Sequence, residues 1–190
     1  MANRRASSAR SRKPLDAARL GELALAYVAR FATSRAKLSR YLARKIGESE
    51  WVDGVDADVA RDDTVAKMAR LGFLDDRQYA AMRAGAMTRR GLGARRVQAQ
   101  LRVDGIAGAD ADEALAAARA GAIGAALGFA RRRRFGPFAA RAADDPAQRE
   151  RQVAAFARAG HAPMLARRIL AIAPGDEEAL AALDGEGAAE

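Results

Sequence analysis

Apolar residues recur every three or four positions along most of the chain, which is the spacing of one buried face of an α-helix. The first two such runs are Leu20, Leu23, Tyr27 and Phe31, followed by Leu38, Leu42 and Ile46. No segment alternates between apolar and polar residues over five positions and is then bounded by turn residues, so we expect no β-sheet. The pattern therefore predicts an all-α protein.

Start and stop signals divide this pattern into short helices. Asp16, Ser34 and Asp75 each precede a helical run, and their side chains can accept hydrogen bonds from the free N–H groups of a first turn. The expected stops are glycines followed at once by an apolar residue that can fold back on the last turn. These stops are Gly72, Gly91 and Gly105. We predict a left-handed backbone conformation at all three.

The second half of the chain is less regular. Further helices are predicted from about residue 109, over 146–159 and over 163–172. Gly121, Gly124 and Gly128 weaken a helix by about 1 kcal/mol each relative to alanine, so we expect a hinge or kink there. In the first half, the polar link at residues 47–55 contains Trp51, whose indole we expect to anchor it.

Two pairs of segments resemble each other within the chain. The stretch VAKMARLGF at 65–73 returns as VAAFARAGH at 153–161, and RFATSRAKLSRYL at 30–42 aligns with RRGLGARRVQAQL at 89–101. The two alignments disagree about where a repeat begins. Repetition at this scale indicates stacked helical units of roughly 45 to 55 residues. We expect three units, at residues 15–72, 73–120 and 121–174.

Charged segments flank these units. A basic arm at residues 1–14 contains five cations and no acid, and an acidic tail at residues 175–190 contains six acids and no cation. Neither has an apolar period, so we expect the arm to be disordered and both segments to be dispensable for folding.

Composition narrows the possible chemistry. The chain has no cysteine, and His161 is its single histidine, so disulfides and thiolate metal sites are excluded. No catalytic motif surrounds the histidine, and we expect neither an enzyme nor a bound cofactor or metal. With no secretory segment and no long apolar run, we expect a cytoplasmic protein that does not enter a membrane. The formal net charge of +9 favours a polyanionic partner.

Arginines concentrate in two places that become the candidate binding residues. They are Arg89, Arg90, Arg95, Arg96, Arg102, Arg131, Arg132, Arg133 and Arg134. Arg95 and Arg102 are seven residues apart and share a helix face opposite Val97 and Leu101. The alternative interpretation is a solvated face on which arginines favour helix C-termini. A helix, a glycine-containing break and a short basic helix are also typical of a helix-turn-helix DNA-binding regulator, but here such units recur along the chain.

Several segments resemble the RecX family of regulators of the bacterial recombinase RecA. The central ones are LGFLDDRQYA at 71–80 and RRGLGARRVQAQLRVDGI at 89–106. Others are SRAKLSRYLARK at 34–45, similar to the first unit of that family, and RQVAAFARAGHAPMLARRIL at 151–170, similar to the third. The resemblance covers about residues 20–173.

This resemblance implies tandem three-helix repeats in an elongated, curved array without a catalytic site. It also implies a partner, the RecA nucleoprotein filament, and a protein that lies in the groove of this filament. Such a protein inhibits or tunes the growth or activity of the filament during DNA repair, homologous recombination and the SOS response. DNA itself, single-stranded or duplex, is a further candidate partner, and we expect a monomer. On this interpretation the nine arginines contact the filament or its phosphates.

Overall fold

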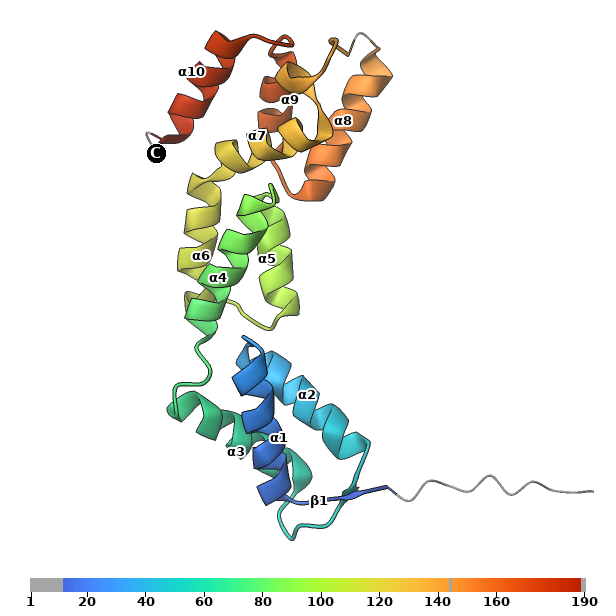
Figure 1. Cartoon of the computed structure of the whole chain (residues 1–190), viewed down its shortest axis with the longest axis vertical. Helices are drawn as coiled ribbons and strands as arrows, with labels where there is room; N and C mark the ends of the chain where they lie inside the picture. Colours follow the sequence, from blue (N-terminus) through green and yellow to red (C-terminus); the bar gives the residue numbers. More distant parts are fainter. Residues whose placement is uncertain (1–11, 144, 189–190) are drawn as a thin grey trace, which may run out of the picture. The chain divides into compact units, whose positions relative to one another are not determined.

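The computed structural model describes residues 12–143 and 145–188, and in them the chain is all-α apart from one pair of very short strands (Figure 1). The all-α prediction is therefore confirmed. The chain divides at Asp75 and Asp76 into two compact units, residues 1–75 and 76–190. Most of the predicted basic arm, residues 1–11, lies outside the described residues.

The first unit contains the helices α1 (Ala17–Arg30), α2 (Arg35–Gly47) and α3 (Ala57–Arg70). Two start signals act as predicted, because the side chains of Asp16 and Ser34 accept hydrogen bonds from backbone N–H groups of the first turns of α1 and α2. The three helices enclose one hydrophobic cluster whose buried members are Leu15, Leu20, Ala24, Leu38, Leu42, Ala60, Met68 and Leu74.

The prediction of no β-structure was wrong at one place in this unit. Strands β1 (Pro14–Leu15) and β2 (Glu50–Trp51) pair in parallel, flanked by hydrogen bonds from Glu50 N–H to Lys13 C=O and from Val52 N–H to Leu15 C=O. Two residues are too few to show an alternating pattern, so the sequence carries no strand signal. The pairing buries Leu15 beneath the helices.

The link between α2 and α3 is fixed by its own polar groups. The Trp51 indole packs on the cluster and donates its N–H to the Val55 carbonyl at 2.8 Å, which is the anchoring that we predicted. Asp53 Oδ2 accepts the Ala17 N–H at 3.0 Å and thereby joins the link to the start of α1. Backbone N–H groups, chiefly that of Ala17 and then that of Val55, hydrogen-bond to the Asp53 carboxyl and lower its pKa, since they favour its charged form.

The second unit begins with α4 (Asp76–Arg89), α5 (Ala94–Val103) and α6 (Ala109–Ala120). Their cluster contains Tyr79, Ala80, Ala84, Met87, Val97, Leu101, Ile106, Ala111, Ala114, Leu115 and Ala118. Asp104 is buried at the end of α5, and its carboxylate accepts hydrogen bonds from the Tyr79 hydroxyl and the Gln100 amide. Helices α4 and α6 contribute mostly alanines to this cluster, for example Ala84 and Ala114, which are 3% and 4% exposed.

The remainder of this unit comprises α7 (Ala122–Arg133), the short 3-10 helix η1 (Gly136–Phe138), α8 (Pro146–Ala159), α9 (Pro163–Ala171) and α10 (Glu177–Ala188). Their own cluster has as its buried members Ala126, Leu127, Ala130, Val153, Phe156, Ala166, Ile169 and Leu183. Phe129 and Phe135 pack on Phe156 at its centre, with ring centroids 4.9 and 6.2 Å away.

The predicted helix stops are confirmed. Gly72, Gly91 and Gly105 have φ values of 77°, 71° and 79°. In each case the following residue donates its N–H to a carbonyl in the last helical turn, for example Phe73 to Met68 at 3.0 Å. Gly160, with φ of 94°, ends α8 in the same manner.

A break occurs where the glycine-rich stretch begins. At Gly121 the chain passes from α6 to α7, and the two directions differ by 62°. Gly124 and Gly128 lie within α7 instead of interrupting it.

Over the described residues no single helix has the length and apolar character to cross a membrane, and α6 with α7 meets that criterion only as a bent pair.

The acidic tail differs from the prediction. Residues 177–188 form α10, which packs on α7, and Leu183 is only 4% exposed. The expectation of no apolar face was wrong because Leu180 and Leu183 are close enough in sequence to share one. Asp176 starts this helix by accepting the Ala179 N–H.

The hydrophobic clusters bear on the proposed repeats. There is one cluster for α1 to α3, one for α4 to α6 and one for the helices from α7 onward.

The conflict between the two internal alignments also has a structural reason. One alignment pairs α1 and α2 with α4 and α5, whereas the other pairs α3, the last helix of its group, with α8, which is in the middle of its group. Exact boundaries at 72, 120 and 174 stay a proposal.

Candidate polyanion-binding surface

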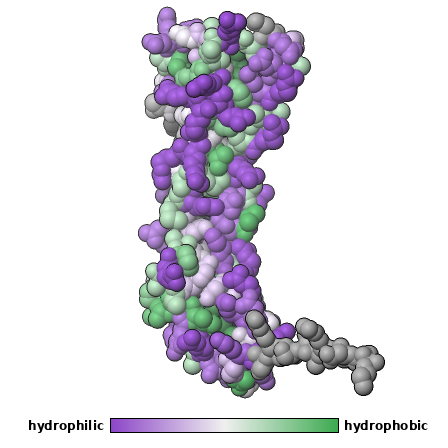
Figure 2. Space-filling model, turned by 45° about the vertical axis from the view of Figure 1, so that its right-hand side comes forward, coloured by the Kyte–Doolittle hydropathy of each residue, from purple (hydrophilic) through white to green (hydrophobic). Residues whose placement is uncertain are grey.

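All nine candidate arginines are exposed. Among the described residues, none of the nine forms an ion pair, whereas Arg61, Arg167 and Arg168 all bind carboxylates. Hydrophilic residues cover much of the face drawn in Figure 2. Charge that is exposed and not neutralised within the chain is available to an external anion.

The first turn of α5 contains two of these cations. Arg95 and Arg96 follow Gly93 and Ala94, and the turn has no acidic residue. The N-terminus of a helix carries partial positive charge, so arginine is unfavourable there. Arg102 lies in the last turn, where the same dipole favours it. The solvated-face interpretation thus explains Arg102 better than it explains Arg95 and Arg96.

The two arginine groups meet at the turn between α4 and α5. The Arg132 guanidinium of α7 donates a hydrogen bond to the Arg90 carbonyl. Gly91 lies under this contact, because a Cβ at that position would overlap the Arg132 guanidinium and approach the Phe129 backbone within 2.9 Å. A single continuous surface therefore includes Arg90 and Arg132.

A second contact fixes the same turn from the other side. The Gly93 N–H donates to the Ala159 carbonyl at 2.9 Å, and the Arg95 N–H donates to the Gly160 carbonyl at 3.3 Å. The start of α5 is thus held by the end of α8. Side chains are excluded at this point, since a Cβ on Gly93 would overlap the Gly160 backbone.

His161 completes this junction. The residue is 2% exposed, and Nε2 of its ring lies 3.0 Å from the Gly91 carbonyl oxygen. A carbonyl only accepts hydrogen bonds, so Nε2 carries the proton. Nδ1 is buried without a partner among the described residues, and burial lowers the pKa of the imidazole. Sequence reasoning found no role for His161, because its partner is seventy residues away.

At the end of α7, two of the arginines place their guanidinium groups over aromatic rings. The Arg131 guanidinium lies 4.9 Å from the centre of the Phe138 ring, and that of Arg133 lies 5.6 Å from the Phe135 ring. Arg134 has φ of 55°, the one positive φ at a non-glycine among the described residues. The helix end therefore turns at an arginine, and four consecutive cations stay at the surface.

The structure thus brings some candidates together and leaves one apart. Arg89, Arg90, Arg95 and Arg96 flank one turn, and Arg132 contacts it. Arg102 is seven residues along α5 from Arg95, or roughly 10 Å at 1.5 Å per residue. Both project away from Val97 and Leu101, which are at most 1% exposed. No group of three or more potential metal ligands occurs in the described part of the chain.

Comparison with known proteins agrees with this architecture. Residues 75–115, which span α4, α5 and the first half of α6, match a family model described as the second three-helix domain of RecX. A relative named regulatory protein RecX, from Myxococcus xanthus strain DK1622, is 31% identical over 161 residues, covering 80% of this chain and 83% of the relative. This chain belongs to the RecX family. The matched three-helix domain corresponds to the group formed by α4, α5 and α6.

Proposed function

We propose that this RecX-family protein modulates, and most simply inhibits, the RecA recombinase by binding RecA filaments on single-stranded DNA. The observation that carries the proposal is the continuous group of exposed arginines around the α4–α5 turn and the end of α7, which binds no carboxylate of the described chain. Two of them stand at a helix N-terminus, where they do not serve the helix.

The chemistry favours binding over catalysis. Arginine forms bidentate hydrogen bonds to phosphate and carboxylate and keeps its charge at any cellular pH. Many separate guanidinium groups suit a long repetitive partner, because each adds a modest electrostatic contribution. We propose a non-enzymatic, cytoplasmic protein that acts as a monomer along such a filament.

The decisive experiment reverses two arginines that lie outside the core. In the double variant Arg95→Glu with Arg102→Glu, binding to RecA-coated single-stranded DNA is expected to weaken on the order of 10-fold or more at low salt. Fluorescence anisotropy across a salt series measures the affinity. Circular dichroism and the melting temperature are expected to stay unchanged, because exposed charges contribute little to stability.

A charge-matched control separates the surface from the net charge. Lys67→Glu with Arg70→Glu makes the same change on exposed residues of α3 in the first unit, and it is expected to alter binding much less. Wild-type affinity with an unchanged salt dependence for the Arg95 and Arg102 variant would overturn the proposal. Tighter binding to naked duplex than to the filament would instead indicate a DNA-binding regulator.

A further inference from the structure

The arginines at the end of α7 share a groove with acidic side chains of α10. Two adjoining hollows, of about 460 and 650 Å³, lie between α7, η1 and α10. Arg131, Arg132 and Arg134 line them on one side. Asp176, Glu177 and Asp184 line them on the other.

These opposite charges face the same space without pairing. Among the described residues, no nitrogen of Arg131, Arg132 or Arg134 lies within 4.0 Å of a carboxylate oxygen. Ion pairing does occur elsewhere on α10, where Glu186 binds Arg168 of α9 with N–O distances of 2.6 and 2.8 Å. The acids along the groove therefore act on the arginines through the intervening hollow and not by direct contact.

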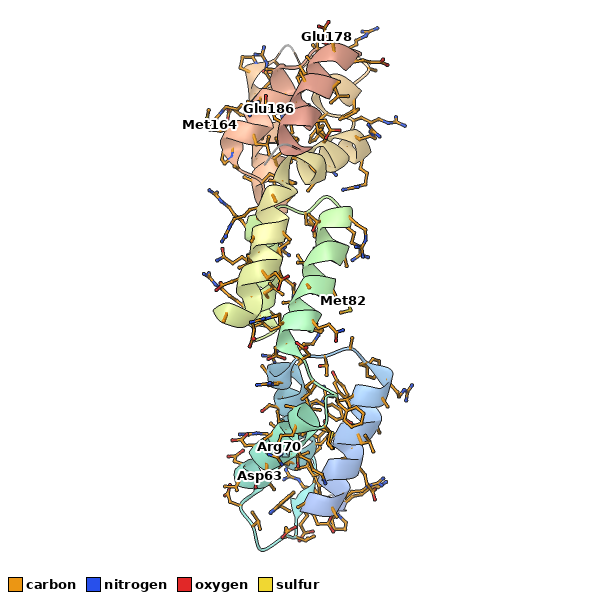
Figure 3. All side chains as sticks on the ribbon, turned by 90° about the vertical axis from the view of Figure 1, so that its left-hand side faces the viewer. Asp63, Arg70, Met82, Met164, Glu178 and Glu186 are labelled. Carbon is orange, nitrogen blue, oxygen red and sulfur yellow. The ribbon has the colours of Figure 1, made fainter. Side chains whose placement is uncertain are left out.

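The position of α10 is set by other contacts. Leu183 is buried in the cluster beneath it, the Glu186 pair holds it to α9, and Gly187 packs against Ile123. Figure 3 shows Glu178 and Glu186 towards opposite ends of this helix. A hydrogen bond from the Gly175 N–H to the Pro137 carbonyl also holds the chain just before the helix, and neither Glu177 nor Asp184 takes part in these contacts.

Helix stability accounts for only some of these acids. Asp176 caps α10, and Glu177 lies in its first turn, where the helix dipole favours negative charge. Asp184 lies in the second half of the helix, where the dipole does not favour it. Its place on the groove opposite Arg131 and Arg132 is what distinguishes it.

We propose that α10 is an internal competitor for the α7 arginines, whose carboxylates weaken the binding of external phosphate to this part of the surface. The inference rests on the proposed function and adds its regulation. Carboxylates that line the same hollows reduce the positive potential there, and an incoming nucleic acid strand must overcome their repulsion. Filament binding is thereby held below the strength that the arginines alone would give.

Removing the acids without changing their shape tests the idea. In the double variant Glu177→Gln with Asp184→Asn, affinity for RecA-coated single-stranded DNA and for a fluorescent oligothymidylate is expected to rise about threefold or more at low salt. The gain is expected to vanish near 1 M salt, where screening acts over about 3 Å. Asp176 is left intact because it caps the helix.

Two further variants make the result specific. Asp110→Asn with Asp112→Asn changes the net charge equally on exposed residues in the first turn of α6, which lie about 16 and about 14 Å of helix from Gly121 by helical rise. It is expected to raise affinity much less. In an Arg131→Gln background, the gain from the α10 variant is expected to shrink, since a coupled pair is not additive.

The outcomes are distinguishable. Equal gains from the α6 and α10 variants, or no gain from α10 while reversal of Arg95 and Arg102 still weakens binding, would overturn the internal competitor and leave the proposed function standing. If the wild-type chain binds neither probe, both proposals fail. Circular dichroism and melting check that each variant is folded, and Glu177→Gln alone provides a milder version.

Discussion

Two helix ends in this molecule have the same backbone conformation but different surroundings. At Gly72 the φ value is 77° and the next N–H, of Phe73, bonds to Met68; at Gly160 it is 94° and the N–H of His161 bonds to Phe156. A Cβ on Gly72 would meet no atom within 4 Å. A Cβ on Gly160 would overlap the first turn of α5.

The comparison separates two reasons for glycine. At Gly72 the residue is required only by the left-handed turn. At Gly160 the same turn also approaches Gly93 and Arg96 of α5 so closely that no side chain fits. In the first unit, the glycine stop at Gly72 only ends a helix. In the second unit, the stop at Gly160 ends α8 and also joins it to α5.

The largest effect is expected at the crowded turn. Replacing Gly160 with alanine adds the strain of a left-handed alanine, about 1 kcal/mol, to overpacking against α5, about 2 kcal/mol. We expect urea unfolding of the second unit to show a loss of about 3 kcal/mol. Hydrogen exchange at the start of α5 is expected to accelerate as well, because its contacts to residues 159 and 160 are displaced.

A smaller effect is expected at the open turn. Gly72→Ala introduces the same left-handed strain without a clash, so its loss of stability is about 1 kcal/mol. Urea unfolding of the two variants side by side gives the difference directly. Equal losses would show that the methyl group added at residue 160 is accommodated against α5 without cost, and would remove the distinction drawn between the turns.

The smallest effect is a dependence on pH at the crowded turn. Burial lowers the pKa of His161 below 6.5, so the unfolded chain binds the proton more readily than the folded chain. Stability is therefore expected to fall as the pH drops below 6.5.

His161→Gln tests this dependence, because glutamine does not titrate. Unfolding by urea at pH values above and below 6.5 is the measurement, with the wild-type chain alongside. The variant is expected to lose the acid-induced part of the change. If both chains weaken in parallel, groups other than His161 are responsible. The Asp53 carboxyl is not one of them, because its lowered pKa makes it contribute stability that is lost only in more acidic solution.

Much of the fold could be predicted because its signals are local. Asp16 and Ser34 cap helices within three residues of themselves, and Gly72 and Gly105 end them within five. Such short-range hydrogen bonds leave a recognisable mark in the sequence. The break at Gly121 was predicted for the same reason, although Gly124 and Gly128 proved compatible with a packed helix.

Contacts between distant residues left no comparable mark. The pairing of Pro14 with Glu50 depends on geometry set by three helices, and two residues show no period. The docking of α10 depends on an apolar face of only two leucines, Leu180 and Leu183, in a helix that contains four acids. Composition predicted a polar tail there, and packing overrode it.

The sequence predicted which residues belong to the candidate surface better than it predicted how they are arranged. Charge density alone pointed to Arg95 and to the four arginines from 131 to 134. That Arg132 reaches the Arg90 carbonyl, forty-two residues away, follows only from the fold. That Asp184 lines the same hollow as Arg131 and Arg132 likewise follows only from the packing of α10 on α7.

The contact between α5 and α8 is made by main-chain atoms, and this has a consequence for how such proteins diverge. Neither hydrogen bond, from Gly93 to Ala159 or from Arg95 to Gly160, depends on a side chain. We therefore expect relatives to vary the side chains at residues 95 and 159 freely, while the two glycines stay because a Cβ at either one would overlap the other segment. We therefore expect no covariation between these positions. In an alignment, the junction will be visible only as two glycines, one that ends a helix and one that precedes a helix.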